Sequence, residues 1–295
     1  MRTLTLRVSE AQAGRTVQSL LRREMQMPEG LVSALKFRET GLLLNGLRCR
    51  STDRVRAGDE LTAEIGDEPA ETGVVPRPWP LSIPYEDEDL LVLDKPAGMA
   101  THGRSERGDV TAAAALAAYW GTDRAFHPVS RLDRDTTGLL VVAKSRYIHE
   151  RLRRMLHTPD FVRRYLAIVE GTPPEPEGSV TLPLEKDPFL KNTMRAAREG
   201  GAPARTDYRV LETRGALSLV EARLYTGRTH QIRVHLAALG CPLAGDRRYG
   251  ASAAPLPRPA LHSAYLSLRQ PVTGARIERK SPMPEDMEAL WTSIR

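Results

Sequence analysis

The stretch HPVSRLDRDTTGLLVVAKS, residues 127–145, places a charged segment directly before an apolar run. The run GLLVVA is typical of a buried strand, so the charged segment before it is predicted to be a loop. Five residues of that loop hold two arginines and two acids: Arg131, Asp133, Arg134 and Asp135. Loops held by rigid strands are where reactive groups are usually placed. Either acid could instead cap a turn or pair with a neighbouring arginine, so this stretch alone leaves both interpretations open.

Length and composition favour a globular chain of two domains, or one large domain with an accessory. The chain has 295 residues, of which 41% are hydrophobic, and it contains no apolar stretch long enough to span a membrane. Its first residues alternate apolar and polar side chains, which predicts a strand and not a signal peptide. Cys49 and Cys241 are far apart and form no metal-type or disulfide-type spacing, which favours a reduced, cytoplasmic location.

The charge balance is basic, with a net charge of +6 and a pI of about 9.5. Arginine supplies 37 of the 43 basic residues, and arginine suits bidentate contacts with phosphate. A polyanionic partner would explain this composition, and so would codon bias in a GC-rich genome. Composition alone does not decide between them.

Residues 1–65 are predicted to form a small α/β unit. Apolar spacing indicates one helix in RTVQSLLRREM and a second in EGLVSALKFRETG, the latter with Gly41 as a candidate cap. LLLNG predicts a strand and a turn at Asn45–Gly46, and VRAGDEL a turn at Gly58–Asp59 followed by a closing strand. In order and spacing this region resembles the S4-type RNA-binding fold. The resemblance implies RNA contacts from four basic residues, which could equally lie on a solvated helix face: Arg22, Arg23, Lys36 and Arg38.

Residues 66–80, GDEPAETGVVPRPWP, are rich in proline, glycine and acids and are interpreted as a linker. The remaining body, residues 81–295, alternates short strands and helices, with a hairpin predicted about Arg214–Gly215. Because most strands can meet in hairpins, the body is predicted to be α+β with a largely antiparallel sheet and flanking helices.

A second polar stretch, residues 224–250, reads LYTGRTHQIRVHLAALGCPLAGDRRYG and predicts a helix capped by Thr229 and ended by Gly240. His230 and His235 within it are five residues apart, which is not the i, i+4 spacing of a helical zinc pair. No HExxH or CxxC motif accompanies them, so no metal site is predicted. A third stretch, RRYLAIVEG, carries Tyr165, which could pack within its strand or stack on a base.

Taken together, these stretches resemble the RluA/RluD-type family of RNA pseudouridine synthases. RLDRDTTGLLVVAK is similar to the family's RLDxxTSGL motif, RYLAIVEG to its K/R-x-Y-x-A-x-V-x-G strand, and GRTHQIRVH with the following GDRRYG to its late segment. LLVLDKPAGMATHG and LHSAYLSL are similar to two further family motifs. The resemblance covers residues 81–285 approximately, and an S4-type module is a common attachment in this family.

The resemblance implies a cofactor-free and metal-free isomerisation of uridine to pseudouridine in RNA. It assigns the essential aspartate to Asp133, beside which Arg233 should favour the ionised carboxylate. Tyr165 would pack on the base, and Arg131 would fill the stack left by the flipped uridine. Arg228 and His230 also fall in the implied RNA-binding motif. Asp135 and Thr136 are then expected to shape the loop.

The expected substrate is 23S rRNA, with tRNA as the alternative. Two further hypotheses compete with catalysis on RNA. One is an RNA-binding or ribosome-assembly protein with the same fold and little activity. The other is a glycoside hydrolase with paired acids, although Asp133 and Asp135 are too close in one turn to straddle a sugar. A monomer is the default expectation. The family often has histidine before RLD, where this chain has Ser130.

Overall fold

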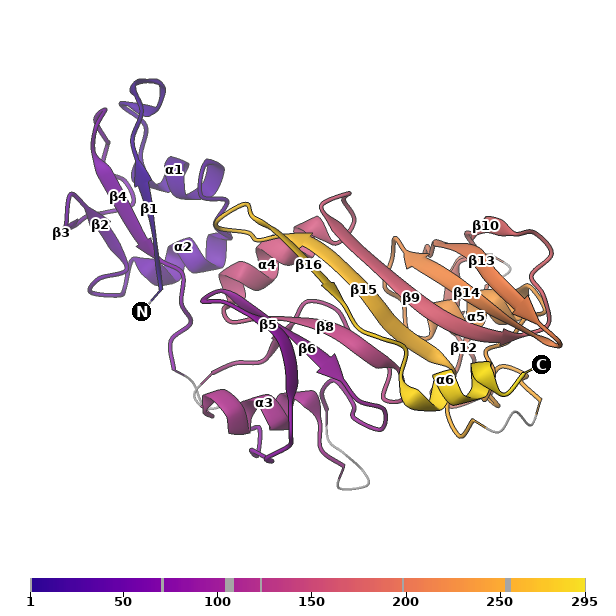
Figure 1. Cartoon of the computed structure of the whole chain (residues 1–295). Helices are drawn as coiled ribbons and strands as arrows, with labels where there is room; N and C mark the ends of the chain where they lie inside the picture. Colours follow the sequence, from indigo (N-terminus) through magenta and orange to yellow (C-terminus); the bar gives the residue numbers. More distant parts are fainter. Residues whose placement is uncertain are drawn as a thin grey trace.

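The computed structural model describes residues 2–69, 72–103, 109–122, 124–197, 199–252 and 256–294. It contains an N-terminal unit built on a four-stranded sheet and a body built on a 10-stranded sheet. Figure 1 shows the N-terminal unit at one end of an elongated body whose long central strands are β9 and β15.

The N-terminal unit packs two short helices against its sheet. Its elements are β1 (Thr3–Arg7), η1 (Glu10–Gln12), α1 (Val17–Arg23), α2 (Glu29–Leu35), β2 (Leu42–Leu44), β3 (Leu47–Arg48) and β4 (Glu60–Glu64). The strands lie in the order β1-β4-β2-β3 and are antiparallel. The predicted turn is confirmed, because Asn45 and Gly46 both have positive φ between β2 and β3. Gly41 does not cap α2, which ends at Leu35. It lies against the Leu35 carbonyl, where a Cβ would collide.

The body is a mixed sheet with helices on its faces and edges, which confirms the predicted α+β class. Its elements are β5 (Ser82–Glu86), β6 (Leu90–Lys95), α3 (Ala112–Trp120), β7 (His127–Pro128), β8 (Thr137–Ala143), α4 (Arg146–Met155), β9 (Phe161–Glu170), β10 (Glu177–Val180), β11 (Leu184–Lys186), β12 (Met194–Ala196), β13 (Thr206–Arg214), β14 (Leu217–Leu224), α5 (Gln231–Ala238), β15 (Leu261–Arg269), β16 (Arg276–Lys280) and α6 (Glu285–Thr292). The sheet order is β10-β13-β14-β9-β15-β8-β6-β5, with β16 beside β15 and β7 beside β8. The predicted hairpin about Arg214–Gly215 is confirmed as β13–β14.

The two halves of the large sheet meet where β8 runs parallel to the start of β15. Gly138 pairs with Ser263 at this junction and has φ +102. A Cβ on Gly138 would collide with the Ser263 backbone, so the contact requires glycine. The junction lies directly after the charged loop, which the sheet therefore carries at its centre.

The hydrophobic core continues from the N-terminal unit into the body. One cluster of buried side chains includes Leu20 and Leu61 of the unit together with Leu139 and Ile148 of the body. The Tyr147 hydroxyl of α4 also donates to the Met25 carbonyl at 2.6 Å. The unit is therefore packed on the body and is not a freely tethered module.

The described residues of 66–80 contain no helix or strand. They are nevertheless held on the body, because the Asp67 carboxylate accepts from the Arg146 backbone N–H at 2.9 Å and contacts His127 at 2.6 Å. No helix in the described part of the chain has the length and apolar character needed to cross a membrane.

Candidate active site

The charged loop between β7 and β8 is held in place by two polar side chains, Lys95 and Thr101. The Lys95 ammonium, buried at the end of β6, donates to the Arg134 carbonyl at 2.9 Å and to two carbonyls of the turn that follows β6. Burial lowers the pKa of Lys95 to about 7, while the charges of Asp135 and Asp133 raise it. The Thr101 hydroxyl donates to the Leu132 carbonyl at 2.8 Å and accepts from the Leu132 N–H. These bonds fix the loop backbone on both sides of Asp133.

Asp133 extends from this loop towards Arg233 in the first turn of α5. The Arg233 guanidinium donates to the Asp133 carboxylate at 3.3 Å, and the Asp133 side chain remains 28% exposed. The predicted arginine beside Asp133 is therefore present, although the two residues are 100 positions apart in the chain. The Asp133 carboxylate therefore has a cationic hydrogen-bond donor beside it.

Arg233 is itself oriented by a second carboxylate, Asp246, which is 1% exposed. The guanidinium donates to the two Asp246 oxygens at 2.6 and 2.8 Å. One face of the guanidinium lies 5.0 Å from the centroid of the Tyr249 ring. Arg233 is thus held bidentately from one side and presents its remaining nitrogen to Asp133.

The start of α5 differs from the prediction. Thr229 does not cap the helix; its hydroxyl accepts from the Arg131 guanidinium at 3.2 Å. The N-cap is His230, which has φ +56 and makes no side-chain cap bond. The buried Gln231 side chain instead accepts from the Arg228 N–H at 3.0 Å and from the Thr226 hydroxyl at 2.7 Å. Gln231 therefore fixes the loop that leads into the helix.

The left-handed conformation of His230 brings its ring to the site. Its Nε2 lies 3.8 Å from the Asp133 carboxylate, and its Nδ1 lies 2.7 Å from the Tyr249 hydroxyl. Burial lowers the pKa of His230, and the Asp133 charge opposes that shift. The lowered pKa favours the neutral ring at neutral pH.

Tyr165 lies on the buried face of β9, in the core below Asp133. A small cavity of about 40 Å³ is lined by Asp133, Tyr165 and Arg233 together with His230. Burial raises the pKa of Tyr165 above its ordinary value of 10.0. Its phenol is therefore neutral at physiological pH, suited to packing on a base or donating a hydrogen bond.

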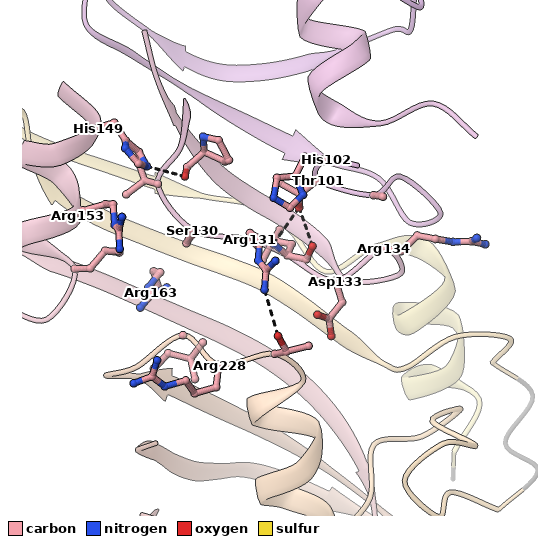
Figure 2. A pocket seen from close by; sticks show the side chains of 18 of the residues that line it. Thr101, His102, Ser130, Arg131, Asp133, Arg134, His149, Arg153, Arg163 and Arg228 are labelled. Carbon is pink, nitrogen blue, oxygen red and sulfur yellow. Dashed lines mark hydrogen bonds between the residues drawn. The ribbon is translucent and has the colours of Figure 1, made fainter. Parts of the chain in front are cut away.

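Asp133 also borders two larger clefts, of about 740 and 600 Å³. Arg131 and Arg228 are exposed on the wall of the first cleft, shown in Figure 2. Arg134 points away from Asp133 in that view and pairs with Asp109 at 3.1 Å. The Asp135 side chain contacts Arg134 at 3.4 Å, and the loop is held through the Asp135 carbonyl, which accepts from Arg258 at 3.2 Å.

The four basic residues singled out in the N-terminal unit lie in two environments. Arg23 and Lys36 are exposed, and Arg22 is exposed with an ion pair to Glu29 at 3.1 Å. The Arg38 side chain is only 12% exposed and pairs with Glu68 at 2.9 Å. Arg38 also donates to the Gly66 carbonyl at 3.0 Å, so it stabilises the exit from the unit.

Several residues of the site were not singled out from the sequence. Asp246 and Tyr249 both lie within GDRRYG, whose family pattern GDxxYG was the available signal. Lys95 lies in LDKPAGM, where a lysine next to a turn gave no sign of burial. Arg163 shares the cleft and precedes Tyr165 by two residues.

Among the residues placed by the structure, no cluster of three or more His, Cys, Asp or Glu side chains is arranged to hold a metal ion. His235 is buried and contacts the Thr206 hydroxyl and the Leu182 carbonyl, each at 2.9 Å. These contacts give His235 a structural role within the body.

Comparison with known proteins identifies the fold and the family. Residues 89–238 match the family model for RNA pseudouridylate synthases. The chain is 36% identical to ribosomal large subunit pseudouridine synthase D of Escherichia coli O157:H7, covering 99% of this chain and 94% of that protein. It is 42% identical to the protein of the same name from Nitrosomonas europaea, covering 73% of this chain and 66% of that one.

Among solved structures, human RNA pseudouridylate synthase domain-containing protein 1 superposes with a TM-score of 0.58 at 28% identity, covering 71% of this chain and 87% of that one. The matched family segment contains Asp133, Tyr165 and Arg233, which line one cavity. The chain therefore belongs to the RluA/RluD family and is an RNA pseudouridine synthase, an enzyme that isomerises uridine in RNA.

Proposed function

We propose that this enzyme converts specific uridines of 23S rRNA, with Asp133 as the nucleophile or base of the reaction. The observation that carries the assignment of Asp133 is its position: it borders both large clefts and the small cavity beside Tyr165 and Arg233. The rRNA target is supported by the names of two relatives, which are synthases of the large ribosomal subunit.

The chemistry is a rearrangement within one nucleotide. The bond between ribose C1′ and uracil N1 breaks, and a bond between C1′ and C5 forms. The proton leaves C5, and N1 gains one, so the product is an isomer of the substrate. An ionised Asp133 can attack the sugar or remove a proton, and the Arg233 guanidinium orients it through a charged hydrogen bond. In this proposal the neutral Tyr165 packs on the uracil and assists the proton transfer at C5.

The test compares two acids of the same loop. Asp133→Asn keeps the shape of the side chain and removes its charge, and it should abolish conversion of uridine while binding of RNA persists. Asp135→Asn is the matched control, because Asp135 is an acid of the same loop whose direct contact is with the exposed Arg134 guanidinium. Conversion is mapped in bacterial rRNA and tRNA by carbodiimide modification and primer extension. Normal activity of Asp133→Asn would refute the catalytic assignment.

We further propose that residues 1–65 are an S4-type RNA-binding unit, joined through the linker 66–80 to a catalytic unit of residues 81–295, and that the enzyme acts as a monomer without a cofactor. Arg22, Arg23 and Lys36 are the accessible cations of the N-terminal unit in this proposal, with Arg131, Arg228 and His230 at the cleft.

Point substitutions test the N-terminal unit better than its deletion, because its core is continuous with that of the body. Replacing Arg22, Arg23 and Lys36 by glutamine should weaken binding of a large rRNA fragment. It should also make the slope of log K against log salt concentration shallower, by the equivalent of up to three phosphate contacts. Conversion of a minimal hairpin should be affected less. An unchanged salt dependence would remove these three residues from the RNA-binding surface.

A further inference from the structure

One arginine of the cleft is buried beside an aromatic ring and without an acid: the Arg163 guanidinium carbon lies 5.8 Å from the centroid of the Phe161 ring. Arg163, on β9, is 5% exposed, and its Nε and Nη2 atoms are buried without any hydrogen-bond partner. No ion pair links it to an acid among the residues that the structure describes. A buried guanidinium without an anion is costly, because hydration is lost and a cation–π contact at this distance replaces only part of it. Such a group indicates that an anion is missing.

The position of Arg163 directs it to the reacting nucleotide. Strand alternation places Phe161, Arg163 and Tyr165 on the same buried face of β9, whereas Arg164 lies on the opposite face. Arg163 is close enough to Tyr165 for its charge to lower the pKa of that phenol, against the larger effect of burial. It is therefore about 7 Å along the strand from the residue proposed to contact the uracil.

The walls around Arg163 are also basic. Figure 2 shows Arg163 between Arg153 and Arg228, with Arg131 nearby. Of the described residues that line this cleft, five are arginines and Asp133 alone is an acid. The loop before α5 also reaches the guanidinium, because a Cβ added to Gly227 would lie 3.6 Å from Arg163 Nη1. An anion that enters the cleft would therefore lie beside the buried Arg163 guanidinium.

We propose that Arg163 binds the RNA phosphate that adjoins the target uridine, and that this contact positions the flipped nucleotide over Asp133. The inference rests on the proposed function, because the anion is taken to be part of the RNA substrate. Arg233 does not serve this purpose, since its guanidinium is neutralised by Asp246 and Asp133. Arg163 has no acid and so keeps its charge for the ligand.

The test combines one protein variant with one neutral linkage in the RNA. The substrate is a synthetic hairpin that contains the uridine mapped for the wild-type enzyme, made with a single methylphosphonate at each linkage around it in turn. Single-turnover conversion and the Kd of each hairpin are measured for wild type and for Arg163→Met. Arg164→Met is the matched control, because Arg164 pairs with Glu221 and lies over the Tyr265 ring.

A single methylphosphonate next to the target should slow the wild-type reaction by about ten- to a hundredfold, as expected for loss of a charged hydrogen bond. On natural RNA, Arg163→Met should react more slowly than the wild type by the same factor. The methylphosphonate should then not slow this variant further. Arg164→Met should keep the full sensitivity to the neutral linkage. A purely structural role for Arg163 would not remove this sensitivity.

Arg163→Met should also melt at the same temperature as the RNA-free wild type, or higher, because it removes a buried unpaired charge. A lower melting temperature, or a methylphosphonate effect that persists in Arg163→Met, would overturn the inference. Failure of the proposed function is separate: Asp133→Asn would then retain conversion, whatever the outcome at Arg163.

Discussion

Asp246→Asn tests how the site holds its arginine. The Asp246 carboxylate is buried and accepts two bonds from Arg233, at 2.6 and 2.8 Å. Asparagine keeps one acceptor oxygen, but it turns an N–H₂ group towards the second guanidinium nitrogen and leaves the Arg233 charge less compensated. Breaking a buried ion pair costs about 3–5 kcal/mol, and the retained bond places this variant near the lower limit. The expected loss of about 3 kcal/mol lowers the melting temperature by about 6–12 °C.

The same substitution should reduce activity through Asp133. With Asp246 neutral, Asp133 becomes the stronger partner of Arg233, and the guanidinium is expected to shift towards it. A displacement of about 1 Å at Asp133, the proposed reacting group, would cost about a hundredfold in rate. Single-turnover conversion of a hairpin should fall by about that factor, while the Kd for the RNA changes little.

Two further variants separate the causes. Asp207→Asn is the matched control, because Asp207 also accepts two bonds from one arginine, Arg205, at 3.0 and 3.2 Å, but both side chains are partly exposed. It should cost about 1 kcal/mol or less. Adding Arg233→Met to Asp246→Asn should recover stability and not activity, because it removes the uncompensated charge. Urea unfolding followed by circular dichroism measures the stability of each variant, and single-turnover conversion measures its activity. If Asp246→Asn unfolds at the wild-type midpoint, the pair contributes no net stability and the reasoning is refuted.

Three further outcomes follow from the loop and the strands around it. Gly138→Ala should lower the free energy of unfolding by about 3 kcal/mol in urea titrations, because a Cβ meets the Ser263 backbone and φ is +102; a neutral effect would show that the sheet junction can open. Lys95→Met should slow single-turnover conversion about tenfold or more and leave RNA affinity unchanged, because Lys95 links the Arg134 carbonyl of the loop to two carbonyls of the turn after β6. Unchanged kinetics would show that the loop needs no such support. Burial raises the pKa of Tyr165 above 10.0, so the folded state retains the phenol proton to a higher pH than the unfolded state does. The free energy of unfolding should therefore fall more steeply above pH 10 in the wild type than in Tyr165→Phe. Parallel pH curves from urea titrations would contradict this.

The order of secondary structure was predictable from local pattern. The apolar run after the charged loop, the alternation in RYLAIVEG and the turn at Asn45–Gly46 each became the expected element. These signals are local, because period and turn chemistry depend on neighbouring residues. The helix start at Thr229 was wrong for the same reason. Threonine is a common cap, but here its hydroxyl binds Arg131 and a left-handed His230 takes its place.

The site depends on contacts that no local pattern carries. Asp133 and Arg233 are 100 positions apart, and only the resemblance to a family brought them together before the structure did. Asp246 looked like an ordinary turn acid, because nothing in GDRRYG reveals that its carboxylate is buried. Arg163 and Arg164 are identical neighbours in sequence. Alternation says that they face opposite ways, but only the tertiary structure shows that Arg164 meets an acid and Arg163 does not.

The two buried arginines of the site are distinguished by what neutralises them. Arg233 is compensated within the protein, so its charge acts on Asp133 and is present before RNA binds. Arg163 has the Phe161 ring beside it but no acid, so under the proposal its burial costs stability in the free enzyme and an RNA phosphate offsets that cost. In the free enzyme the Asp133 carboxylate, the proposed catalytic group, already has its cationic partner, whereas under the proposal Arg163 gains an anionic partner only when RNA binds. This division explains why a phosphate contact would affect the rate through position, and why loss of Arg163 should stabilise the empty enzyme while it slows the reaction.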